Sequence, residues 1–150
     1  MNWIALTPVM AALLAAAPAL ADLTRAKAEP NLERRSRLAL DNAAAEFRAG
    51  SEAYRGGDWA KTVAALKGMG ESVDFAYASL KQTGRIPRNS GHHKNLELKL
   101  RNLLKNLEGL RRTMAFEERE QLAPLSEHLH NLHDEVLQSI MAPRERKDKP

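Results

Sequence analysis

The sequence predicts an all-α protein: an up-down-up-down four-helix bundle at residues 31–141, behind a cleaved signal peptide at residues 1–21. Three observations predict this. Apolar residues recur at alternating steps of three and four, the spacing of helices packed at a shallow angle. β-branched residues are few after residue 21, which disfavours strands. The first 21 residues carry no charged side chain, unlike the rest of the chain.

The N-terminal segment has the features of an export signal. Its apolar run ends in Ala19-Leu20-Ala21 just before Asp22, the small-x-small pattern that signal peptidase reads. The alternative is an uncleaved anchor, but the run is short for a bilayer core that needs about 20 apolar residues, and two prolines interrupt it. We expect cleavage after Ala21, a periplasmic or secreted product, and no transmembrane span in the mature chain.

The first predicted helix, at residues 31–54, follows a polar leader at residues 22–30. Asn31 is its expected cap. We assign one side of this helix to the core: Leu40, Ala43, Ala44, Phe47, Ser51 and Tyr54. The paired glycines 56–57 then favour a turn.

The second predicted helix spans residues 58–82, with Asp58 as its cap. It has a heptad stripe: Trp59, Val63, Leu66, Gly70, Val73, Tyr77 and Leu80. Gly70 falls on the buried stripe, where it either admits a close neighbour or marks a local bend. The loop 83–91 follows, and Asn89 or Ser90 is expected to cap the next helix.

The third and fourth helices are predicted at residues 92–114 and 117–141. The third carries a strict stripe: Leu96, Leu100, Leu103, Leu107, Leu110 and Met114. The stripe of the fourth is Leu122, Leu125, Leu129, Leu132, Val136 and Ile140. Pro124 is expected to kink or restart that helix, because it lacks an N–H. Short loops favour closure within one chain over coiled-coil dimerisation, and residues 142–150 read as a disordered basic tail.

Charge and cysteine content narrow the function. Residues 94–115 carry six basic and two acidic side chains, whereas residues 117–141 carry six acidic and one basic. We expect these segments to neutralise each other in the fold, which together with export disfavours a nucleic-acid partner. The chain has no cysteine, and therefore no disulfide, thiolate metal site or thiol nucleophile.

The main candidate for chemistry is the histidine-rich segment 126–135. Glu127, His130 and Asp134 follow at steps of three and four, so they share one helix face, and His128 and His133 adjoin it. Such a face suits a divalent metal. The alternative is a polar flank beside the leucine stripe, and the second Glu-x-x-His pair that di-metal bundles require is missing.

No enzyme is predicted. The chain has neither a Gly-x-Ser-x-Gly nucleophile elbow nor a glycine-rich phosphate loop after a strand. We also predict no cofactor.

Residues 45–75 resemble a single tetratricopeptide-like helical hairpin. The matching positions are Gly50, Ala53, Tyr54, Gly57, Asp58 and Trp59, while Thr62 stands where alanine is usual. The resemblance implies protein or peptide binding, although no second copy of the repeat follows. The stretch 86–104 is also similar to small exported helical bacterial proteins of no assigned function.

These features together predict an exported protein-binding or structural module of the cell envelope. Its partner is expected to be another envelope protein or a second copy of the chain. The alternative function is divalent-metal binding or sensing through the histidine-rich helix.

Overall fold

The computed structural model describes residues 23–143, which are helical with no strand among them. The elements are α1 (Thr24–Ala28), α2 (Leu32–Arg55), α3 (Trp59–Gln82), the 3-10 turn η1 (Pro87–Asn89), α4 (Gly91–Arg111) and α5 (Phe116–Met141). The predicted all-α class is therefore confirmed. The predicted signal peptide at residues 1–21 lies outside the described residues, as does the tail beyond residue 143.

Side-chain caps start three of the four long helices where the sequence predicted them. Asn31 Oδ1 accepts the backbone N–H of Arg34 at 2.9 Å, and Asp58 Oδ1 accepts that of Lys61 at 3.0 Å. Ser90 Oγ accepts the N–H of His93 at 3.3 Å. Each oxygen satisfies a backbone donor that has no partner within the first helical turn.

α5 starts in a different way. Glu118 reaches back one turn, and its Oε2 accepts the backbone N–H of Ala115 at 3.0 Å. The helix then continues without interruption through Pro124, so the predicted restart at this proline does not occur.

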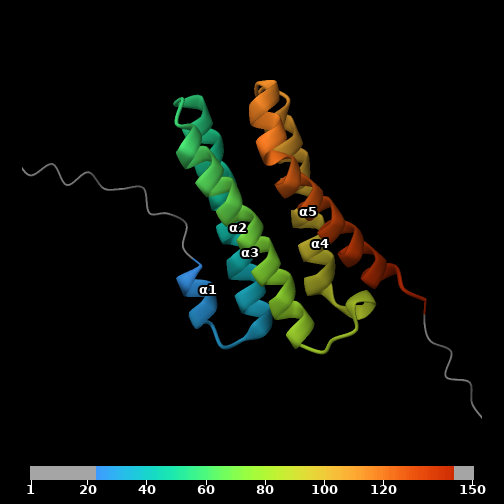
Figure 1. The fold of residues 1–150 in the computed structure, drawn as a ribbon. Helices are drawn as coiled ribbons and strands as arrows, with labels where there is room; N and C mark the ends of the chain where they lie inside the picture. The colour runs from blue at the N-terminus through green and yellow to red at the C-terminus, as the bar shows by residue number, and fades with distance from the viewer. Residues whose placement is uncertain (1–22, 144–150) are drawn as a thin grey trace, which may run out of the picture.

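The long helices form two hairpins, α2–α3 and α4–α5, which lie side by side (Figure 1). Successive long helices run in alternating directions. Between the hairpins, α2 packs against α4, and α3 packs against both α4 and α5. A side-chain hydrogen bond joins α2 to α5, from Tyr54 to Glu118. The hairpins separate toward the end that holds the α2–α3 and α4–α5 turns (Figure 1).

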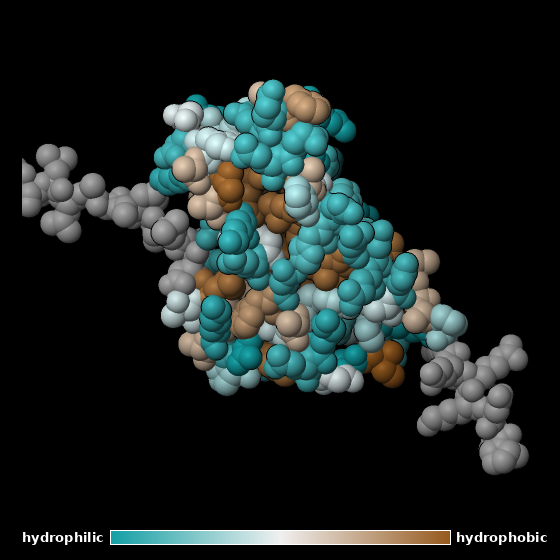
Figure 2. Space-filling view, in the orientation of Figure 1, coloured by the Kyte–Doolittle hydropathy of each residue, from teal (hydrophilic) through white to brown (hydrophobic). Residues whose placement is uncertain are grey.

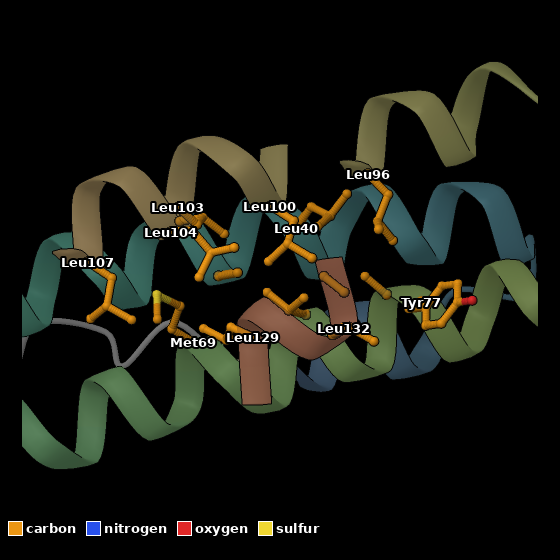
Figure 3. Close-up of a cluster of buried hydrophobic side chains, with 14 of the residues drawn as sticks. Leu40, Met69, Tyr77, Leu96, Leu100, Leu103, Leu104, Leu107, Leu129 and Leu132 are labelled. Carbon is orange, nitrogen blue, oxygen red and sulfur yellow. The ribbon is translucent and has the colours of Figure 1, made fainter. Parts of the chain in front are cut away.

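The core lies between the four long helices and consists mainly of leucine (Figure 3). Five leucines on α4 are fully or almost fully buried: Leu96, Leu100, Leu103, Leu104 and Leu107. Opposite them lie Met69 of α3 and Leu129 of α5, both with no exposed surface. Most residues of the stripes predicted for α3, α4 and α5 therefore lie in the core or pack against it, whereas Val63 does neither.

Gly70 marks a close approach of two helices rather than a bend. A Cβ added at this position would lie 2.8 Å from Cδ1 of Leu125 on α5. α3 remains one continuous helix through Gly70. The first of the two alternatives for this glycine is therefore correct.

The leader expected at residues 22–30 contains a short helix, α1, that packs on α2. Ala26 is buried in the core and Leu23 packs against it. Arg35 Nε donates to the carbonyl of Glu29 at 2.8 Å and so holds the turn between α1 and α2.

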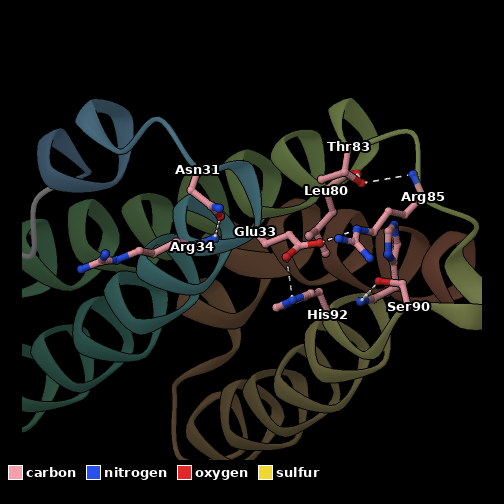
Figure 4. A network of polar contacts seen from close by, with 9 residues as sticks. Asn31, Glu33, Arg34, Leu80, Thr83, Arg85, Ser90 and His92 are labelled. Carbon is pink, nitrogen blue, oxygen red and sulfur yellow. Dashed lines mark hydrogen bonds and ion pairs between the residues drawn. The ribbon is translucent and has the colours of Figure 1, made fainter.

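The α3–α4 loop is fastened to the start of α2 (Figure 4). The carboxylate of Glu33 on α2 pairs with Arg85 in the loop and lies 3.0 Å from Nε2 of His92 on α4.

In the described residues no helix is long and apolar enough to cross a membrane.

Candidate functional site: a groove between the two hairpins

A groove of about 620 Å³ lies between α2 and α4, near the end where the hairpins separate. Its apolar wall is formed by Phe47 and Tyr54 of α2 and Leu110 of α4. All three side chains are partly buried and pack against the edge of the core. The remaining lining residues are small or polar: Ser51, Arg55, Lys105, Asn106, Gly109 and Thr113.

Gly109 gives the groove part of its depth. A Cβ added there would meet no atom within 4 Å, so the glycine leaves open space and is not required by close packing. A side chain added at this position would therefore start from open space in the lining of the groove.

The groove exists because α2 has two apolar faces, and α3 covers one of them. The face toward α3 is made of small or short residues, among them Ala39, Ala43, Gly50 and Ala53, which allow the two helices to approach closely. The second face holds Phe47 and Tyr54. Of the α2 residues predicted to face the core, Leu40 and Ala43 are buried there, whereas Phe47, Ser51 and Tyr54 line the groove, because no described helix covers them completely.

Two aromatic residues tie the hairpins together at this end. Tyr54 Oη donates to Oε2 of Glu118 at 3.0 Å and also lies 3.3 Å from the carbonyl of Thr113. Trp59 Nε1 donates to Oε1 of Gln121 at 3.0 Å. The two rings pack edge-to-face, with centroids 6.4 Å apart. Burial and the bond to Glu118 raise the pKa of Tyr54, so its hydroxyl stays protonated and can donate.

The charged residues that line the groove are cationic. Arg55 and Lys105 lie on its rim, and Lys99 lines a smaller adjoining cavity of about 190 Å³ that shares Asn106 with the groove. Lys99 is neutralised by Asp41 at 3.0 Å. Lys105 has no ion pair with any described residue, and no carboxylate lines either cavity. The groove therefore presents an apolar wall beside an uncompensated positive rim.

The opposite face of the molecule, formed by α3 and α5, also shows apolar side chains in the seam between the hairpins (Figure 2). Hydrophilic residues flank this seam on both sides. The hairpins thus leave apolar surface uncovered along the line where they meet.

The predicted neutralisation of α4 by α5 is wrong at the level of ion pairs. Across the described chain, no Lys or Arg of α4 pairs with a carboxylate of α5. Instead, the carboxylates of α4 face histidines of α5, because Glu97 contacts His133 and Glu108 contacts His130. The cations Lys105 and Arg112 and the anions Glu117 and Glu120 are left without partners in the described residues.

Each histidine among the predicted metal residues contacts a different carboxylate on a neighbouring helix. His128 Nε2 lies 2.8 Å from Oδ1 of Asp74 on α3, and His133 Nε2 lies 2.9 Å from Oε1 of Glu97 on α4. His130 Nε2 is 3.8 Å from Oε1 of Glu108. Asp134 is exposed and lies 3.5 Å from Nδ1 of His133.

Within residues 23–143, no group of three or more His, Asp or Glu side chains is placed to hold a metal ion. Glu127 is exposed and has no partner among these residues. Metal ligation by the predicted set would require the histidines to leave their carboxylate partners. Divalent-metal binding stays a prediction of the sequence.

The two carboxylates of α4 are held ionised by their neighbours. Burial alone would raise the pKa of Glu97, but hydrogen bonds from His133 and Arg101 outweigh it and lower the pKa. Glu108 behaves in the same way: burial opposes ionisation, whereas hydrogen bonds from Ser126 and Arg111 lower its pKa. These groups act as structural acceptors between helices.

No family model matches this chain, and no curated protein and no solved structure matches it either.

Proposed function

We propose that the chain is an exported protein-binding module of the cell envelope, in which the four long helices form a bundle and the groove between α2 and α4 receives a helical segment of the partner. The observation that carries this proposal is the uncovered wall formed by Phe47, Tyr54 and Leu110. An apolar groove between helices is a common docking place for the apolar face of another helix. The apolar run at residues 1–21 supports the location.

The groove chemistry specifies the partner segment. Aliphatic or aromatic side chains of the partner would contact Phe47 and Leu110, because burying apolar surface supplies most of the binding free energy. Carboxylates beside them would face Arg55 and Lys105, which have no acidic neighbour in the groove. The expected ligand is thus an acidic amphipathic helix.

Site-specific photo-crosslinking tests this proposal. A photo-reactive residue placed at Ser51, inside the groove, is activated in intact cells, and the adducts are identified by mass spectrometry. A control protein carries the photo-reactive residue at Ile86 instead, an exposed site in the loop between α3 and α4. This loop lies at the opposite end of the fold (Figure 1). We expect a reproducible adduct at Ser51 that is absent at Ile86.

Gly109 supplies a matched pair of variants for the same experiment. Gly109→Trp fills the groove and should abolish the Ser51 adduct, whereas Gly109→Ala adds one methyl group and should leave the adduct in place. An adduct that persists in Gly109→Trp, or the lack of any adduct specific to Ser51, would refute binding in the groove.

A further inference from the structure

Phe116 is an exposed aromatic residue beside unpaired acidic groups. It is the first residue of α5, and 64% of its surface is exposed. Glu117 and Glu120 follow within the first turns, are exposed, and have no partner in the described chain. An aromatic side chain flanked by carboxylates has the chemistry that the groove is expected to recognise.

Phe116 and the groove lie at the same end of the molecule. Tyr54 and Thr113 line the groove, and Tyr54 hydrogen-bonds to Glu118, two residues after Phe116. Thr113 precedes Phe116 by three residues. The turn at residues 112–115 is too short to place Phe116 far from the groove, yet Phe116 does not line the groove of its own chain.

This end of the molecule carries both the groove and Phe116 with its acidic neighbours. Such a surface can pair with an identical copy about a two-fold axis. In an isologous dimer, each chain offers the same patch, so residue i of one chain contacts residue j of the other and the reverse contact forms as well. Two copies facing each other at this end would bring each Phe116 to the partner's groove, and would bring Glu117 and Glu120 to the cationic rim at Arg55 and Lys105.

We propose that the occupant of the groove is a second copy of this chain, which inserts Phe116 and so forms an isologous dimer. This inference rests on the proposed function, because it requires the groove to be a protein-binding site. Charge complementarity favours this occupant: among the residues that the structure describes, no carboxylate lines the groove, and Glu117 and Glu120 pair with no cation.

The two kinds of contact have different roles. Burial of Phe116 supplies the anchor, since aromatic side chains dominate the energy of small interfaces. The charged pairs set the orientation and speed the encounter of the two chains, and dissolved salt screens them. Added sodium chloride should therefore weaken the dimer without abolishing it.

Sedimentation equilibrium of the protein purified after export measures the dimer directly. Phe116→Ser should weaken dimerisation by about 10-fold or more, as expected for loss of a buried aromatic anchor. The matched control is Ile86→Ser, which removes an apolar side chain of nearly equal exposure, 66%, from the opposite end of the fold. The control should dimerise like the parent chain, and circular dichroism should show equal helix content in all three proteins.

A charge exchange tests the orientation. One variant reverses the rim (Arg55→Glu with Lys105→Glu), and the other reverses the anions (Glu117→Lys with Glu120→Lys). Each variant alone should dimerise about 10-fold more weakly, because like charges then face each other at both contacts. Mixed in equal amounts, they should form a heterodimer of near-parental affinity, because both contacts again join opposite charges.

Three results would overturn the proposal. The first is a parent chain that stays monomeric at up to about 1 mM, where contacts of micromolar affinity are saturated. The second is equal weakening of dimerisation by Phe116→Ser and Ile86→Ser, and the third is no recovery of dimerisation when the two charge variants are mixed. A monomeric chain that still gives a Ser51 adduct with a different protein would refute the second copy as occupant and retain the proposed function. Loss of every Ser51 adduct would refute both.

Discussion

Nε2 of His133 on α5 lies 2.9 Å from Oε1 of Glu97 on α4, between the two helices of the second hairpin. The two side chains are largely covered, with 16% and 11% exposed, and Arg101 bonds the other oxygen of Glu97 at 2.9 Å. His133 is one of the predicted metal residues, and in the structure it joins α5 to α4 through this largely covered polar contact.

A double-mutant cycle on Glu97→Gln and His133→Ala should show coupling. We expect about 1–2 kcal/mol, measured by urea unfolding near neutral pH, because the contact is shielded from water. His128 and Asp74 form a matched control: their atoms are equally close, at 2.8 Å, but the side chains are 51% and 46% exposed. This exposed pair should couple by less than about 1 kcal/mol. Equal coupling in the two cycles would contradict the role given to the covered pair.

His93 should make the fold sensitive to mild acid. It is buried, its Nδ1 has no partner in the described residues, and burial followed by the charge of His92 lowers its pKa below the usual 6.5. A histidine with a lowered folded-state pKa contributes stability that is present above its unfolded pKa and is lost as the pH falls through the folded value. Urea unfolding should therefore show a loss of stability starting below pH 6.5, and His93→Gln should reduce this loss.

A second loss of stability is expected at lower pH, from Glu97 and Glu108. Their pKa values are lowered relative to the usual 4.5, so their contribution is present above that value and is lost as the pH falls below it. His93→Gln should leave this second step in place, whereas Glu97→Gln should reduce it. A single step removed entirely by His93→Gln would show that the α4 carboxylates do not contribute.

Two glycine-to-alanine changes should have opposite effects on stability. Gly109→Ala should stabilise the protein by roughly 0.5–1 kcal/mol, since alanine favours a helix and the new Cβ meets nothing. Gly50→Ala should be net destabilising by about 1 kcal/mol, because its Cβ would lie 3.0 Å from Cδ2 of fully buried Leu66. Thermal unfolding of both variants checks the signs, and stabilisation by Gly50→Ala would show that Leu66 can move aside.

Export should leave a product that begins at Asp22. N-terminal sequencing or intact mass of the protein from the envelope fraction measures this directly. Ala21→Arg, which removes the small residue before the cleavage site, should retain residues 1–21. A product of the full 150 residues from the parent chain would show that this segment is kept.

The sequence was sufficient for the four long helices and for three of their caps, because these depend on neighbours within about four residues, but it did not predict α1. It was not sufficient for the groove. The spacing of Phe47 and Tyr54 identifies an apolar face on α2, but not whether another helix covers it. The small residues around Gly50 are the signal that α3 would take the other face.

The sequence was likewise not sufficient to predict which charged side chains contact each other. Glu127, His130 and Asp134 share a face by spacing, yet the carboxylates that contact two of the α5 histidines come from other helices. Asp74 of α3 contacts His128, and Glu108 of α4 contacts His130. Net charge per segment likewise predicts attraction between α4 and α5 but does not say which atoms meet. Partner choice depends on the relative rotation of the helices, which no single-helix pattern records.

The separation of the chain into two hairpins sets an order of folding events. α2 and α3 meet through a tight turn at Gly57, whereas the bonds of Tyr54 and Trp59 to the second hairpin span 59 to 64 residues. Contacts close in sequence form at a lower loop-closure entropy, so each hairpin is expected to precede their docking. The groove has one wall from each hairpin and does not exist before they dock. Recognition at this site is therefore restricted to chains that have completed the last step of folding.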